Sequence, residues 1–107
     1  MLRVSIDSLK QYEQIFGQEK IRRLWLEFTE DARQKLDQAE KCDKEEQRLA
    51  FHSLRSSSLV FGMTAFSTFC QKTEEEILNG ITTGKETLSE ARKLLIESMA
   101  DVEAYLA

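Results

Sequence analysis

His52 is the residue best suited to chemistry, because it is the only histidine among the 107 residues of the chain. It opens the run HSLRSSS at positions 52–58. A neutral imidazole nitrogen is a nucleophile near neutral pH, and cationic or hydroxyl neighbours can bind an anion attached to it. Arg55 and Ser56 follow three and four positions later, the spacing that brings side chains together on a helix. The run therefore predicts an accessible imidazole beside a positive charge.

A helical wheel of the segment around His52 predicts that the ring lies on the exposed face. The apolar side of the wheel holds Ala50, Leu54, Ser57 and Phe61, with Ser58 close by. The opposite side holds His52, Arg48, Arg55, Ser56 and Leu59. The pattern argues against a histidine buried in the core. An ordinary surface histidine remains an alternative.

The neighbours of His52 are expected to leave the ring open and to surround it with charge. Helical side chains lean toward the N-terminus of their helix, so Ser56 would overhang the ring. A serine leaves the ring accessible, whereas a Leu, Glu or Lys would shield it. Arg55 can place a guanidinium near the ring, and Arg48 adds a second positive charge one turn earlier. Ordinary solvated surface charge is the alternative for both arginines.

Three apolar residues lie toward the histidine side of the same helix or at its edges: Leu49, Leu59 and Val60. Taken singly, each is expected to pack against a flanking helix. Taken together, they could form the edge of an apolar docking surface around His52, with Arg48 as a further docking residue. Ser57 and Ser58 are small residues that would permit close packing of a neighbouring helix.

Glycines and polar clusters divide the chain into segments of helical length, and no β-type alternation persists. Apolar residues at helical spacing predict helices at 7–16, 19–40, 44–61 and 64–79, and a last one ending near 106. Asp43 with Glu46, and Thr83 with Glu86, have the spacing of capping boxes at the start of the third helix, at 44–61, and of the last helix.

The predicted fold is all-α, with one domain spanning residues 1–107. A short leading helix precedes four longer amphipathic helices with brief connections. Short connections favour antiparallel neighbours, so the expected architecture is an up-down-up-down four-helix bundle with an additional N-terminal helix.

Composition excludes several classes of function. Acidic residues outnumber basic ones by 19 to 15, a balance that argues against nucleic acid as the main partner. No apolar run is long enough to span a bilayer and the N-terminus lacks a signal-peptide core, so a cytoplasmic location is expected. Cys42 and Cys70 form no CxxC pair and are interpreted as reduced thiols. With a single histidine, a zinc site is not expected.

The chain resembles the histidine-containing phosphotransfer (HPt) domains of phosphorelays. The family pattern is roughly His-x-Leu-Lys-Gly-Ser-(Ser/Ala), a glycine ten positions after the histidine, and an apolar helix with a cysteine and an acid or amide. The residues that match directly are His52, Leu54, Ser57, Ser58, Gly62, Cys70 and Glu74. Arg55 replaces the usual lysine and keeps its charge, whereas Ser56 replaces the usual glycine. The resemblance covers essentially the whole chain.

The resemblance implies that His52 accepts a phosphoryl group from an aspartate of a receiver domain and passes it to another. Response-regulator receivers or a hybrid sensor kinase would be the partners, and the receiver would supply Mg²⁺. Glu74 would orient the second ring nitrogen, unless it is a surface acid in the run at 74–76. The chain would be a monomeric phosphoryl carrier with no cofactor. It has no P-loop and lacks the Glu and Pro typical of a kinase phosphorylation helix, so no ATP-dependent kinase activity is expected.

Two alternatives remain open at the level of sequence. The chain could be a non-catalytic HPt-like module that docks a receiver or kinase without phosphoryl transfer, and the serine at position 56 keeps this alternative open. It could also be an unrelated structural bundle, an alternative that a His52 buried in the core would favour.

Overall fold

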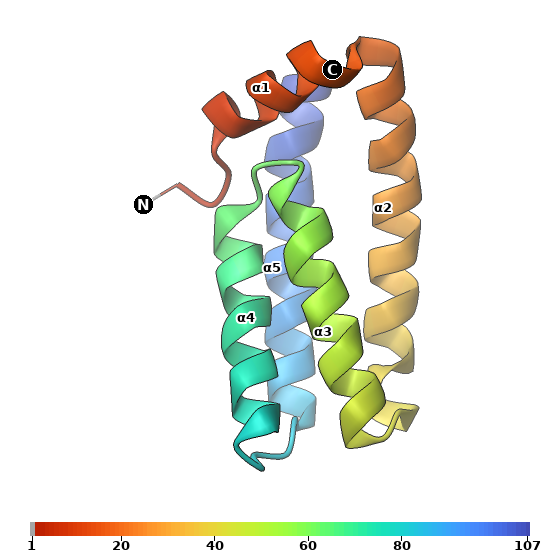
Figure 1. The fold of residues 1–107 in the computed structure, drawn as a ribbon, viewed down its shortest axis with the longest axis vertical. Coiled ribbons are helices and arrows are strands. Elements are labelled where there is room, and N and C mark those ends of the chain that lie inside the picture. The colour runs from red at the N-terminus through yellow and green to blue at the C-terminus, as the bar shows by residue number, and fades with distance from the viewer. Residues whose placement is uncertain (1) are drawn as a thin grey trace.

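The computed structural model describes residues 2–107, which fold into five α-helices and one short 3₁₀ helix without a strand. The α-helices are α1 (Ile6–Phe16), α2 (Gln18–Gln38), α3 (Lys44–Leu59), α4 (Thr64–Leu78) and α5 (Lys85–Leu106); the 3₁₀ helix η1 (Ala39–Lys41) follows α2. In Figure 1, α2 to α5 lie along the long axis of the molecule and are joined at alternate ends, while α1 crosses one end. The all-helical prediction is confirmed.

Local sequence signals explain some helix ends but not others. Asp43 and Glu46 form the predicted capping box of α3, with Glu46 N donating to Asp43 Oδ1 at 2.8 Å and Asp43 N donating to Glu46 Oε1 at 3.3 Å. The capping box predicted at Thr83 and Glu86 is wrong. Gly84 takes the extended N-cap conformation, and α5 begins one residue later than that box requires, so Thr83 lies outside the helix. No side-chain cap hydrogen bond forms there.

One continuous apolar core runs between the helices, and it differs from the predicted core at α3. The buried residues of α3 are Gln47, Phe51, Leu54 and Ser58. Ala50 and Ser57, predicted to face inward, are half-buried, and Phe51 is fully buried instead. The buried face is rotated because α3 packs mainly against α4 and only secondarily against α2. Position 51 therefore lies closer to the centre than position 50.

The turn between α3 and α4 is held by the N-terminal segment. Gly62 has a φ of +68° and accepts a hydrogen bond of 2.7 Å from Ser5 N. A Cβ at position 62 would lie 2.3 Å from the backbone oxygen of Ser5, so only glycine fits this turn. Ala65 N donates to Arg3 O at 3.2 Å on the other side of the turn. These contacts fix where α3 ends and where α4 begins.

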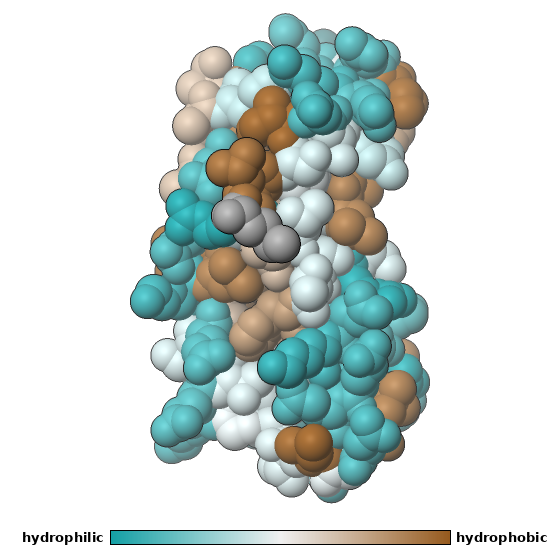
Figure 2. Space-filling view, turned by 90° about the vertical axis from the view of Figure 1, so that its left-hand side faces the viewer, coloured by the Kyte–Doolittle hydropathy of each residue, from teal (hydrophilic) through white to brown (hydrophobic). Residues whose placement is uncertain are grey.

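The surface is largely polar on the side that Figure 2 shows, where apolar side chains gather in separate small groups. Eight large apolar residues are exposed over the described chain: Leu2, Ile15, Leu26, Leu49, Leu59, Leu78, Ile81 and Ile96. None of the helices within residues 2–107 combines the length and the hydropathy needed to cross a membrane.

Candidate functional site

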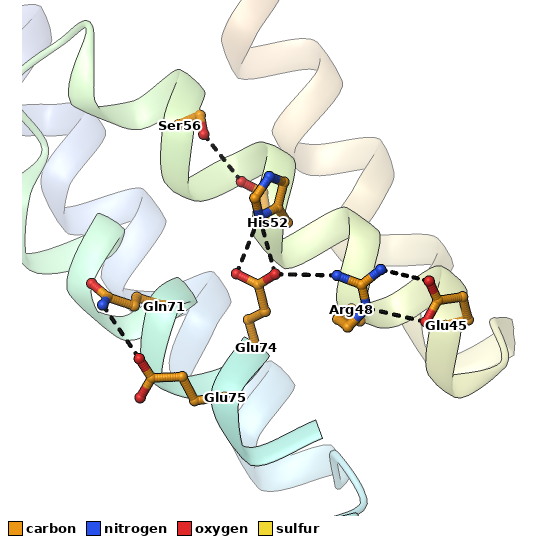
Figure 3. A network of polar contacts seen from close by, with 7 residues as sticks. All are labelled: Glu45, Arg48, His52, Ser56, Gln71, Glu74 and Glu75. Atoms are coloured by element: carbon orange, nitrogen blue, oxygen red, sulfur yellow. Dashed lines mark hydrogen bonds and ion pairs between the residues drawn. The ribbon is translucent and has the colours of Figure 1, made fainter. Parts of the chain in front are cut away.

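His52 lies in the middle of α3 with its side chain 50% exposed, as the helical wheel predicts. The interpretation of His52 as a core histidine is thus excluded by the structure. Its Nδ1 lies 3.0 Å from Glu74 Oε2 and 3.3 Å from Glu74 Oε1. Figure 3 shows the second ring nitrogen, Nε2, on the side of the ring away from Glu74. One nitrogen is therefore held by the protein and the other faces outward.

Glu74 is a buried acid of α4, with a side chain only 10% exposed, and not a surface member of the run at 74–76. A buried carboxylate must be paired or hydrogen-bonded, because burial removes its hydration. Its two oxygens lie against the His52 ring and the Arg48 guanidinium, as Figure 3 shows. A carboxylate at Nδ1 accepts a hydrogen bond from the Nδ1–H of the neutral ring, which leaves the lone pair on Nε2.

The register of the α3–α4 hairpin explains why His52 and Glu74 meet. The two helices run in opposite directions in Figure 1. His52 lies about 10 Å from the end of α3 and Glu74 about 15 Å from the start of α4, at about 1.5 Å per residue. Side chains lean toward the N-terminus of their own helix, so Glu74 leans toward the turn and His52 leans away from it. The difference in height between the two backbones is thereby bridged.

A second contact fixes the same register nearer the turn. The hydroxyls of Ser58 and Ser67 both donate to the backbone oxygen of Arg55, at 3.1 Å and 3.0 Å. Both serines are buried, and their small side chains allow the close approach of α3 and α4 that the sequence predicted for position 58.

Arg48 is bound to two carboxylates. Its Nε and Nη2 donate to Glu45 at 3.0 Å and 2.5 Å, and its Nη1 donates to Glu74 Oε2 at 3.4 Å. The hydrogen bond to Glu45 is the main cause of a raised pKa of Arg48, and the same hydrogen bond lowers the pKa of Glu45. Sequence reasoning treated Arg48 as a second free charge near the ring or as a docking residue. In the structure it is instead part of the network that holds Glu74.

Arg55 and Ser56 follow His52 by three and four positions on α3. The guanidinium of Arg55 takes part in no hydrogen bond or ion pair within residues 2–107, and the residue is half-buried. Ser56 is exposed, and its hydroxyl lies 3.5 Å from the backbone oxygen of His52, as Figure 3 shows. The serine hydroxyl therefore points back along the helix and not across the ring. The access to His52 predicted from a small residue at position 56 agrees with the exposure of the ring.

The predicted docking residues divide into two groups. Leu49 and Leu59 are 50% and 47% exposed, so they can form an apolar rim on the surface of α3. Val60 is half-buried and packs against the core, which is the alternative considered for it.

The two cysteines take no part in this site. Cys70 is fully buried, and burial raises the pKa of its thiol to about 12. Cys42 is half-buried and not disulfide-bonded. Among residues 2–107, no three His, Cys, Asp or Glu side chains are grouped so that they could hold a metal ion.

Comparisons with protein families, characterised proteins and solved structures found no match to this chain. The site therefore has to be interpreted from its own geometry. Sequence reasoning missed the contacts of Arg48. The spacing of Glu45 and Arg48, three positions apart on a helix, was a signal for the first contact, whereas the contact with Glu74 depends on the tertiary register.

Proposed function

We propose that this chain is a histidine phosphotransfer domain of a phosphorelay, which accepts a phosphoryl group on His52 from a receiver aspartate and passes it to another receiver. The fold is then an antiparallel up-down-up-down four-helix bundle with an additional N-terminal helix. The observation that carries the proposal is the orientation of the exposed His52 ring. Its Nδ1 faces the buried carboxylate of Glu74 at 3.0 Å, and its Nε2 faces outward.

The transfer step follows from this orientation. The Nε2 lone pair of neutral His52 attacks the phosphorus of an aspartyl phosphate on the receiver. The P–N bond forms as the P–O bond to the aspartyl carboxyl group breaks, and the receiver recovers its carboxylate. Nδ1 keeps its proton, so the phosphorylated ring is an imidazolium whose positive charge lies beside the carboxylate of Glu74. Transfer to the next receiver runs the same step in reverse.

Glu74 contributes in two ways. In the resting state it accepts a hydrogen bond from Nδ1–H and so keeps the lone pair on the outward nitrogen. In the phosphorylated state its charge stabilises the imidazolium that the attack creates. An amide could perform the first task but not the second, because it carries no charge.

Arg55 and Ser56 complete the site on the solvent side. The phosphoryl group brings negative charge to the exposed face of α3, where the Arg55 guanidinium is free of other ion pairs among the described residues. Ser56 allows an approaching receiver to reach the ring. Mg²⁺ is expected to come from the receiver, and a cytoplasmic monomer remains the prediction from the sequence and its resemblance.

The test is phosphoryl transfer from a panel of receiver domains charged with acetyl phosphate. Intact-mass measurement should detect one phosphoryl group on the wild-type chain, and the group should be labile in acid. His52→Gln keeps a polar side chain but lacks the nucleophile, so it should remain unlabelled. The proposal fails if no receiver of the panel labels the wild type, or if the label persists in His52→Gln.

Matched variants of Glu74 separate its two tasks. Glu74→Ala removes the acceptor of the Nδ1 proton and should slow transfer by about tenfold or more, the loss expected for a hydrogen bond to a charged group. Glu74→Gln keeps an acceptor oxygen and should lie between wild type and Glu74→Ala. Equal rates for all three proteins would contradict the role assigned to Glu74.

A docking module without phosphoryl transfer is the second candidate, and the exposed Leu49 and Leu59 favour it. Binding needs the apolar rim but no imidazole. A receiver that binds His52→Ala as tightly as wild type, while no protein of the panel transfers a phosphoryl group, would establish this candidate instead.

A further inference from the structure

A neutral His52 cannot balance the negative charge of the buried Glu74 carboxylate. The carboxylate is 10% exposed, and its polar contacts within the described chain are His52 Nδ1 and Arg48 Nη1. A buried carboxylate without a cation is strongly disfavoured. If Arg48 were absent, the nearest way to balance the charge would be a second proton on the His52 ring. That proton would occupy the Nε2 lone pair and abolish the nucleophile.

We propose that Arg48 is a positioning residue that supplies the counter-charge of Glu74, so that His52 can remain neutral while the carboxylate stays ionised and holds Nδ1–H. The consequence for transfer rests on the proposed function, whereas the effect on the ring does not. The inference replaces the interpretation of Arg48 as a charge for the phosphoryl anion or for docking. Of the two arginines, only Arg55 is then left to bind the phosphoryl anion.

The geometry of the Arg48 side chain supports this role. Two of its three nitrogens, Nε and Nη2, are held by Glu45 one turn earlier on α3, at 3.0 Å and 2.5 Å. The third nitrogen, Nη1, is thereby directed at Glu74 Oε2, the oxygen that also lies 3.0 Å from His52 Nδ1. Figure 3 shows the four side chains joined by contacts in one line, from Glu45 through Arg48 and Glu74 to His52. Glu45 acts as an anchor for the guanidinium, because the pair is 65% exposed on the Glu45 side and can bind without burial of the acid.

The decisive measurement is the protonation of the His52 ring at pH 7, read from the ¹⁵N chemical shifts of its two nitrogens. His52 is the only histidine, so the tag-free protein gives a single ring to observe. In Arg48→Gln the ratio of cationic to neutral ring should rise about fivefold, because the largely buried charge of Arg48 no longer balances Glu74. Arg48→Lys retains the charge and should restore a ratio close to that of wild type.

Two controls distinguish this role from a general charge effect. Arg55→Gln removes the same charge from the same helix without a contact to Glu74, and should change the ratio by about twofold or less. Arg48→Gln in a Glu74→Gln background should have a similarly small effect, because the neutral amide needs no counter-charge. The proposal would be overturned if Arg48→Gln raised the ratio of cationic to neutral ring fivefold both with Glu74 and with Glu74→Gln. It would also be overturned if Arg48→Gln did not raise the ratio in the protein that keeps Glu74. Circular dichroism verifies folding, and Arg48→Met, which keeps the aliphatic packing, replaces Arg48→Gln if that variant does not fold.

The measurement of ring protonation needs no partner protein, so its outcome does not depend on the proposed function. If the ratio responds as expected and no receiver phosphorylates the wild type, Arg48 retains its role and the phosphotransfer proposal fails. If the wild type is phosphorylated, Arg48→Gln should also slow phosphoryl acceptance, in proportion to the lost neutral ring, and Arg48→Lys should restore it.

Discussion

Replacement of Gly62 by alanine should destabilise this fold severely, because two separate costs coincide at one residue. Gly62 has a φ of +68°, a conformation that costs an alanine about 1–2 kcal/mol. The new Cβ would also lie 2.3 Å from the backbone oxygen of Ser5, whereas real Cβ atoms keep at least 3.0 Å. The N-terminal segment would have to move by about 0.7 Å.

That movement acts on backbone hydrogen bonds that belong to Ser5. Ser5 N donates to Gly62 O at 2.7 Å, and Ser5 O accepts from Leu9 N at 3.2 Å at the start of α1. Loss or weakening of one or both costs about 0.5–1.5 kcal/mol each. Together with the backbone cost, the expected loss in the free energy of unfolding for Gly62→Ala is about 2–4 kcal/mol.

Gly80 provides the matched control. Its φ is +83°, and a Cβ built there has no atom within 4 Å. Gly80→Ala should therefore lose only the backbone part, about 1–2 kcal/mol. Urea unfolding followed by the fluorescence of Trp25, the only tryptophan and a buried one, measures both variants. If Gly62→Ala and Gly80→Ala lose the same free energy within error, the contact between the turn and Ser5 does not stabilise the fold as argued.

Three further predictions concern single side chains. Ser56→Leu should cover the His52 ring and slow phosphoryl acceptance by about tenfold or more without a loss of stability, whereas Ser56→Gly should behave as wild type; equal rates would refute the steric argument. Ser98 Oγ is buried without a hydrogen-bond partner among the described residues, so Ser98→Ala should leave the melting temperature unchanged or raise it. Because burial raises the pKa of the Cys70 thiol from 9.0 to about 12, its contribution to stability should be complete below pH 9 and lost as the pH rises toward 12; Cys70→Ala should lack this part of the alkaline decline in urea midpoints.

Helix ends were predictable where a short sequence determines the backbone by itself. The Asp43–Glu46 capping box forms because both partners lie within four residues. The same spacing at Thr83 failed, since Gly84 next to it can also take the N-cap conformation and the helix starts after it. Spacing alone does not decide between two adjacent residues that can both begin a helix.

The inner face of α3 was not predictable from a wheel, because apolar residues occur around much of that helix. Leu49, Ala50, Phe51, Leu54 and Leu59 point in several directions, and α4 and α2 decide which of them are covered. Phe51 was therefore missed, although it is among the largest fully buried side chains. The exposure of His52 was nevertheless predicted correctly, since it does not depend on which of two neighbouring positions faces the centre.

Glu74 shows that the sequence held more information about the site than its motif alone. Position 74 follows Cys70 by four residues and precedes Ile77 by three, so it lies along the same inward stripe as these two buried residues. A carboxylate on such a stripe must find a cation or hydrogen-bond donors when it is buried, unlike its neighbour Glu75, which is exposed. A helical hairpin that turns at Gly62 brings this part of α4 beside the part of α3 that carries His52 and Arg48. Periodicity combined with the position of the turn therefore points to a buried acid beside the imidazole, while the distances that make it a partner of both residues require the packed structure.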